Sequence, residues 1–153
     1  MKNLLLSLVL FPVVSMAAPK VGDLAVYTGS MVVNGQSLPI TVTRTIKSIN
    51  ADVVSIEEIF EGGGQSSSAM SEEKLDEMLT EESAQMILDN CAAFGGVNTP
   101  VIVAFGTFNS CKVTQEGAVA YFAAVPFGLA KVEGAQFENA VINLELKSAT
   151  KGQ

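Results

Sequence analysis

Histidine is absent from the sequence, and so are the short motifs of the common catalytic and nucleotide-binding sites. Without histidine, neither Ser-His-Asp nor Cys-His catalysis can operate, and the commonest zinc ligand is missing. The glycines Gly62 to Gly64 are not followed by the lysine and helix of a phosphate-binding loop. The acidic residues do not have the spacing of an EF-hand. We therefore expect a protein that is not an enzyme, with no catalytic residues, no metal site and no cofactor.

Basic residues are scarce. Nine lysines and arginines stand against sixteen acids, which gives a net charge of −7. Ten of the acids lie between Glu57 and Asp89, where Lys74 is the one basic residue. Such a chain does not suit the phosphates of a nucleic acid, so we expect no nucleic-acid partner. The acidic segment fits a solvated helix face, with a cation or partner site as the alternative.

The one long apolar run is at the beginning of the chain. It extends from Leu4 to Val14, after Lys2 and before the small residues Ser15 and Ala17. This is the pattern of a secretory signal peptide, and it predicts cleavage after Ala17 and a periplasmic or secreted protein. A membrane anchor needs about 20 apolar residues, so we expect no transmembrane segment in the mature chain. Residues 18–153 are long enough for a single domain.

Cysteine occurs only at positions 91 and 111. In an oxidising compartment such a pair forms a disulfide more often than it remains as two thiols. The two residues are not in a Cys-x-x-Cys arrangement, which argues against a redox-active pair. We predict a structural disulfide between Cys91 and Cys111.

Alternating apolar residues and turn signals indicate about eight strands. Asn34-Gly35 is the strongest of the hairpin signals, because a type I′ turn needs positive φ at both central residues. On the following strand, Ile40, Val42 and Ile46 lie on one face and threonines on the other. The expected strands are 21–33, 39–47, 53–60, 99–105, 108–113, 118–125, 128–132 and 140–148, with a bulge at Glu57-Glu58.

The remaining segments predict a loop and a helical arm. The run from Gly62 to Ser68 has the low complexity of a flexible loop. Ser71 and Thr80, each followed by two glutamates, predict the caps of one or two short helices within residues 71–91. The expected fold class is therefore mainly β, a curved antiparallel sheet that forms a half-barrel or barrel, with a helical insertion at about 71–91.

Three segments carry a resemblance to a known family. Gly106-Thr107-Phe108 with Cys111-Lys112-Val113, the run from Val125 to Glu133, and the opening Val21 to Tyr27 resemble bacterial exported half-barrel proteins. Those proteins are of the lipoprotein-carrier (LolA/LolB-like) type, together with uncharacterised relatives. The resemblance implies a curved antiparallel sheet with helices over its open side, often around an apolar cavity.

A lipid or another apolar small molecule is thus one expected partner. The side chains that would contact it are apolar residues of the arm and aromatic residues of the sheet, Met78, Leu79, Met86, Phe108, Tyr121 and Phe127. The same side chains also fit an ordinary filled core, which is their commoner role.

Two alternatives to a ligand carrier remain. The first is a structural or protein-interaction domain that meets a protein partner through the acidic arm or a sheet edge. The second is a hydrolase in which carboxylates such as Glu57, Glu58 and Glu145 converge.

Overall fold

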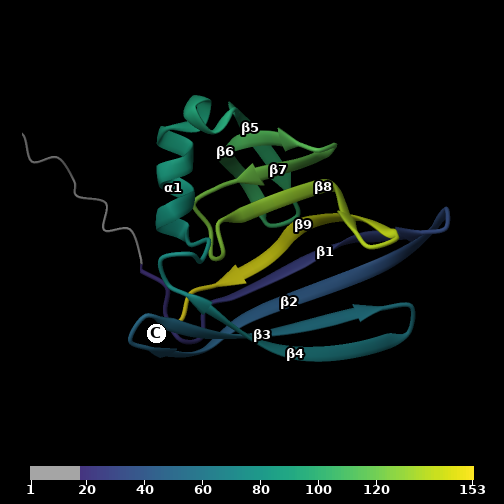
Figure 1. Cartoon of the computed structure of the whole chain (residues 1–153), viewed down its shortest axis with the longest axis horizontal. Helices are drawn as coiled ribbons and strands as arrows, with labels where there is room; N and C mark the ends of the chain where they lie inside the picture. The colour runs from purple at the N-terminus through teal and green to yellow at the C-terminus, as the bar shows by residue number, and fades with distance from the viewer. Residues whose placement is uncertain (1–17) are drawn as a thin grey trace, which may run out of the picture.

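A computed structural model describes residues 18–153, and the predicted signal peptide lies outside the described residues. Within this part of the chain, nine strands form one antiparallel sheet, accompanied by one α-helix and one short 3₁₀ helix (Figure 1). The elements in chain order are β1 (Leu24–Val33), β2 (Gln36–Asn50), β3 (Val53–Gly62), β4 (Gln65–Lys74), α1 (Glu81–Asp89), η1 (Cys91–Phe94), β5 (Val97–Val103), β6 (Gly106–Gln115), β7 (Ala118–Phe122), β8 (Leu129–Phe137) and β9 (Ala140–Thr150).

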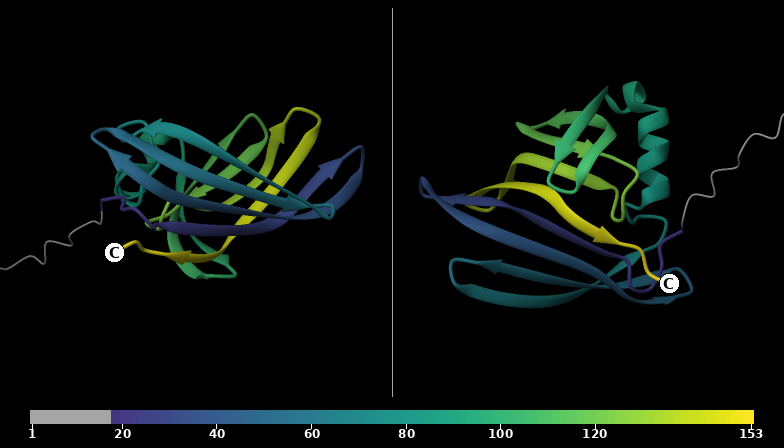
Figure 2. Two further views of the ribbon diagram at one scale, coloured as in Figure 1. Left: turned by 90° about the horizontal axis from the view of Figure 1, so that it is seen from below. Right: turned by 180° about the vertical axis from the view of Figure 1, so that it is seen from behind.

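The sheet consists of two meanders joined through the first and last strands. Its order is β4-β3-β2-β1-β9-β8-β7-β6-β5, and β1 pairs with β9 along its whole length. Figure 2 shows that the sheet is curved and twisted, so that the edge strands β4 and β5 stay apart and the sheet does not close. The predicted mainly β fold, a curved antiparallel sheet with a small helix, is confirmed.

Local turn chemistry produces the hairpins. Asn34 and Gly35 both have positive φ, 50° and 79°, as the predicted type I′ turn between β1 and β2 requires. The turns of the β1–β2, β3–β4 and β8–β9 hairpins lie at the end of the molecule opposite α1 (Figure 1). The strand predicted to reach Val125 ends at Phe122, because residues 123–128 fold into a tight loop in which Ala123 N donates to Gly128 O over 3.0 Å.

The predicted bulge at Glu57-Glu58 is wrong. β3 pairs without interruption from Val53 to Gly62, and the register shift lies in β2, between Ile46 and Ser48. The alternation of polar and apolar residues along β3 is interrupted because Glu58 lies between Ile56 and Phe60 on the apolar face of the strand. Its cross-strand neighbour on β2 is Arg44, so a charged pair occupies that position.

The predicted loop at 62–68 and the helix beginning at Ser71 are also wrong, because these residues belong to β4. Gly63 and Gly64 have φ values of 58° and 77° and reverse the chain, which then pairs with β3 along its whole length. This strand is polar and exposed, so backbone hydrogen bonds rather than burial define it. The helical arm is correspondingly shorter, Glu81–Asp89 plus Cys91–Phe94, and its cap is the predicted Thr80, whose hydroxyl accepts from Ser83 N over 3.0 Å.

The predicted disulfide between Cys91 and Cys111 is confirmed, with Cα atoms 5.5 Å apart. It joins η1 to β6, and both cysteines are buried. Gly96 lies against the bridge: a Cβ there would be 2.6 Å from Cys111 Sγ, so this position has no room for a side chain. The covalent link therefore fixes the end of the helical arm to the sheet.

Candidate ligand-binding cavity

An apolar cavity of about 520 Å³ lies on one face of the sheet. Strands β1, β2, β3, β8 and β9 form most of its wall, and the segments that flank α1 and β8 supply the rest. All lining residues except Arg44 and Glu58 are apolar or aromatic; the full set is Tyr27, Met31, Ile40, Val42, Arg44, Glu58, Phe60, Leu79, Phe127, Leu129, Phe137, Ile142 and Leu144.

Strand register explains why these residues share a face. Val42 is the direct neighbour of both Tyr27 and Phe60, on either side of β2. Met31 and Ile142 are neighbours across the β1–β9 pair that joins the two meanders. Since side chains alternate between the faces of a strand, the neighbours all point to the same side. The cavity therefore depends on the pairing of segments more than a hundred residues apart in the chain.

Gly29 has a steric role in the middle of this wall. It lies between Ile40 of β2 and Leu144 of β9. A Cβ at this position would overlap the backbone carbonyl of Asn143. The glycine therefore allows β9 to approach β1 closely.

The polar part of the wall is a charged cluster around Arg44. Its Nη2 donates to Glu73 Oε1 over 2.8 Å, and its Nε lies 3.2 Å from Glu58 Oε2. The second contact has the distance of an ion pair, but the N–H is not directed at the oxygen, so the buried Nε has no hydrogen-bond acceptor within the described residues. The guanidinium carbon also lies 4.8 Å from the centroid of the Phe127 ring, a cation–π contact. Arg44 is thus held by two carboxylates and an aromatic ring.

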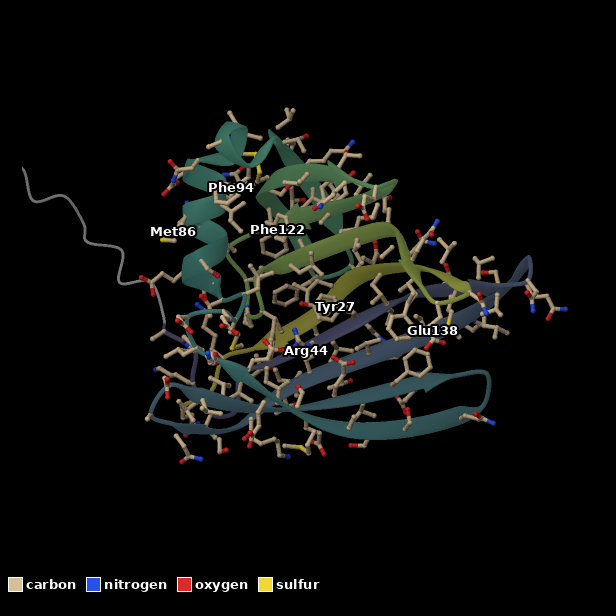
Figure 3. The ribbon with its side chains drawn as sticks, in the orientation of Figure 1. Tyr27, Arg44, Met86, Phe94, Phe122 and Glu138 are labelled. Atoms are coloured by element: carbon tan, nitrogen blue, oxygen red, sulfur yellow. A yellow bond between two sulfur atoms is a disulfide. The ribbon has the colours of Figure 1, made fainter. Side chains whose placement is uncertain are left out.

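Tyr27 lies next to this cluster (Figure 3). Its side chain is buried, and burial raises the pKa of the phenol to about 12, while the positive charge of Arg44 acts in the opposite direction. The hydroxyl is therefore protonated at neutral pH. Within residues 18–153 it has no hydrogen-bond partner, which leaves it as a donor at the cavity wall.

The six residues predicted to contact a ligand are dispersed. Leu79 and Phe127 line the cavity. Met78 is 4% exposed and belongs to the core, and Phe108 packs against that core. Met86 is 57% exposed and projects from α1 away from the sheet (Figure 3).

Tyr121 is on the face of the sheet away from the cavity. Its cross-strand neighbour is Lys131, which in turn pairs with Glu145, and Glu145 adjoins the lining residue Leu144 along β9. The Nζ atoms of Lys112 and Lys131 lie 5.7 and 5.8 Å from the Tyr121 ring centroid. The structure therefore brings two of the six predicted residues together at the cavity.

The lining residues Arg44, Tyr27, Phe60 and Phe137 were not among the predicted ligand contacts, and Glu58 was considered only as a bulge residue and a hydrolase carboxylate. A signal for Arg44 and Glu58 was present, because Arg44 interrupts the apolar face formed by Ile40, Val42 and Ile46. On the next strand, Glu58 interrupts the face formed by Ile56 and Phe60. One charge of each sign on the apolar faces of consecutive strands is the pattern of a cross-strand ion pair.

Two of the three carboxylates considered for hydrolysis, Glu57 and Glu58, do not converge. Glu57 and Glu58 are successive residues of an unbroken strand and point to opposite faces, where Glu57 pairs with Lys47 over 3.1 Å. In residues 18–153, no group of three or more potential ligands is arranged to hold a metal ion. Over the same residues, no helix has both the length and the apolar character needed to cross a membrane.

Comparison with known proteins adds no relative: no protein-family model matches the chain, and no curated protein matches it.

Proposed function

We propose that this chain is an exported, non-enzymatic protein that binds a lipid or another apolar small molecule in the cavity of its half-barrel sheet. The observation that carries the proposal is the cavity of about 520 Å³ with an almost entirely apolar wall. Small-molecule sites have volumes of roughly 300–1,000 Å³ and combine apolar walls with a few polar groups. An apolar ligand in such a cavity removes its own surface and the apolar surface of the cavity wall from water, which favours binding.

The shape of the cavity suits an elongated ligand. Lining residues extend along β1 from Tyr27 to Met31, roughly 14 Å at about 3.4 Å per residue. The charged cluster is at one part of the wall, with Phe137 and Met31 toward the hairpin end of their strands. An extended apolar chain with a polar head therefore matches the distribution of the side chains. The disulfide supports an oxidising, extracytoplasmic compartment for this activity.

The test is binding of an uncharged fluorescent probe, N-phenyl-1-naphthylamine, to the oxidised protein spanning residues 18–153. Ile142→Trp places a large side chain in the cavity, and Val141→Trp places the same side chain on the opposite face of β9. We expect the wild-type protein and V141W to bind the probe, and I142W to bind it at least about tenfold more weakly because the space is filled. Absence of binding to the wild-type protein, or equal binding by both variants, would contradict the proposal.

The sequence contains no tryptophan, so each variant has a single indole whose emission reports its surroundings. A folded I142W variant should show the emission of a buried indole. This control separates a filled cavity from a protein that has failed to fold.

A second candidate function, pairing with another protein, is favoured by the edge strand β5. This strand has a sheet neighbour on one side only, and its apolar residues Val97 and Ile102 are 68% and 76% exposed. Such an edge accepts a further strand, and a second copy of the chain is the simplest partner. Sedimentation velocity over a range of concentrations should show association that Ile102→Lys abolishes. A wild-type protein that stays monomeric throughout would exclude pairing between copies.

A further inference from the structure

The charges around the cavity restrict the kind of polar head that a ligand can carry. This inference rests on the proposed binding function and concerns the chemistry of the bound molecule. Three observations carry it: two carboxylates already hold Arg44, the Tyr27 hydroxyl has no partner, and among residues 18–153 no charged residue other than Arg44 and Glu58 lines the cavity.

Arg44 is not a free receptor for an anion. The Glu73 and Glu58 carboxylates lie within 2.8 and 3.2 Å of its guanidinium nitrogens, and the ring of Phe127 covers one face of the group. Counting these three charged groups, the cluster has a net charge of −1. A ligand carboxylate would have to displace Glu58 or become a third anion beside one cation. Like charges brought together at an interface oppose association.

Tyr27 offers the complementary property. Its hydroxyl is a neutral donor that faces an apolar space and has no partner among the described residues. The hydroxyl is open to the cavity, so a ligand that supplies an acceptor oxygen there can form a hydrogen bond with it, screened from bulk water by the apolar wall. A carbonyl oxygen satisfies the phenol without adding charge beside Glu58.

We propose that the cavity selects amphipathic molecules whose head is an uncharged hydrogen-bond acceptor, such as a fatty ester or amide, over free fatty acids. The acceptor oxygen receives the hydrogen bond of Tyr27, and the apolar chain extends along β1 and β9 toward Met31 and Phe137. Glu58 acts as the selective element, because its carboxylate lines the cavity and repels a second carboxylate.

The experiment compares methyl laurate with laurate, which share one apolar chain and differ in the charge of the head. Each is titrated against the N-phenyl-1-naphthylamine complex at about pH 8, well above the pKa of a carboxylic acid. For the wild-type protein we expect a Kd for laurate at least about tenfold higher than that for methyl laurate. Laurate that displaces the probe as well as the ester, or better, would overturn the proposal.

Charge-neutral variants locate the source of the selectivity. Glu58→Gln should lower the ratio of the laurate Kd to the methyl laurate Kd several-fold, and Glu73→Gln should act in the same direction. Glu57→Gln is the matched control, because it removes the same charge from the adjacent residue on the opposite face of β3. An equal effect of Glu57→Gln would show a general effect of net charge and overturn the assignment to Glu58.

The possible failures are distinguishable. If the probe does not bind, the cavity is not a binding site, and the proposed function fails together with this inference. If the probe binds but neither methyl laurate nor laurate displaces it, the binding function stands and this inference is refuted. If both ligands bind with equal affinity, the binding function stands and the selection by charge is refuted. Tyr27→Phe gives an independent check, since it should weaken binding of methyl laurate but not that of dodecane, which has no acceptor.

Discussion

Removal of the Cys91–Cys111 disulfide should destabilise the protein by about 3 kcal/mol. The bridge closes a loop of 20 residues. In the chain-entropy treatment, a loop of that length restricts the unfolded chain by roughly 11 cal/mol/K, which is about 3 kcal/mol at 25 °C. The unfolding entropy of residues 18–153, at about 2.1 cal/mol/K per residue, converts this into a decrease in Tm of roughly 10 °C.

The assay is urea and thermal unfolding of the oxidised wild-type protein, the reduced wild-type protein and the double variant Cys91→Ala with Cys111→Ala. Reduction and substitution should lower Tm equally, because the packing of the small sulfur atoms contributes less than the cross-link. The denaturant m-value should also rise, since a chain without the cross-link exposes more surface when it unfolds. If the reduced protein melts within about 2 °C of the oxidised one, the entropic reasoning is wrong for this loop.

Three further predictions concern the sheet. Gly29→Ala should lower the unfolding free energy by about 1–3 kcal/mol, because the new methyl group meets a backbone carbonyl of β9, whereas Gly62→Ala meets only side chains and should cost less in urea unfolding. Burial raises the pKa of Tyr27 to about 12 in the folded protein, whereas the phenol of the unfolded chain has a pKa of 10.0. The stabilisation is therefore fully present below pH 10.0, and the free energy of unfolding should decrease by about 3 kcal/mol as pH rises through about 12. Tyr27→Phe, unfolded in urea at each pH, should not show this decrease. The Lys131 hydrogen bond lowers the pKa of Glu133, so the stabilising contribution of Glu133 is present above the ordinary glutamate pKa of 4.5 and lost as pH falls. Because both partners are solvent-accessible, Glu133→Gln should cost less than about 1 kcal/mol at neutral pH, and this cost should disappear in acid.

The strands with a local signal were predictable from the sequence. Asn34-Gly35 determines a hairpin through its own backbone preferences, and the alternation of Ile142, Leu144 and Leu146 defines β9 without reference to any other segment. The disulfide followed from the presence of two cysteines in a chain predicted to be exported.

The prediction failed at β4 because its stability is not local. Serines and glutamates have no preference for a strand, and the acidic residues after Ser71 resemble the first turn of a helix. The strand forms because the Gly63-Gly64 turn returns the chain beside β3, where backbone groups pair along the whole length. Polar edge strands of this kind cannot be recognised from apolar periodicity.

The candidate cavity could be predicted only in part for the same reason. Leu79 and Phe127 were identified, but the wall is assembled from strands whose pairing is established by the fold, above all β1 with β9. Met78 and Met86 were both expected to contact the ligand, yet Met78 is buried in the segment before α1 and Met86 is exposed on α1. The sequence shows two charges of opposite sign, Arg44 and Glu58, on the apolar faces of consecutive strands. The register of β2 and β3 is needed to show that the two residues are cross-strand neighbours.

Native mass spectrometry of the oxidised protein spanning residues 18–153, mixed with methyl laurate, tests directly whether a ligand binds inside the cavity. We expect one bound molecule per chain for the wild-type protein and for V141W, and none for I142W. A wild-type protein that carries no methyl laurate, or an I142W variant that carries as much as the wild type, would show that the cavity between β1, β2 and β9 is not the binding site.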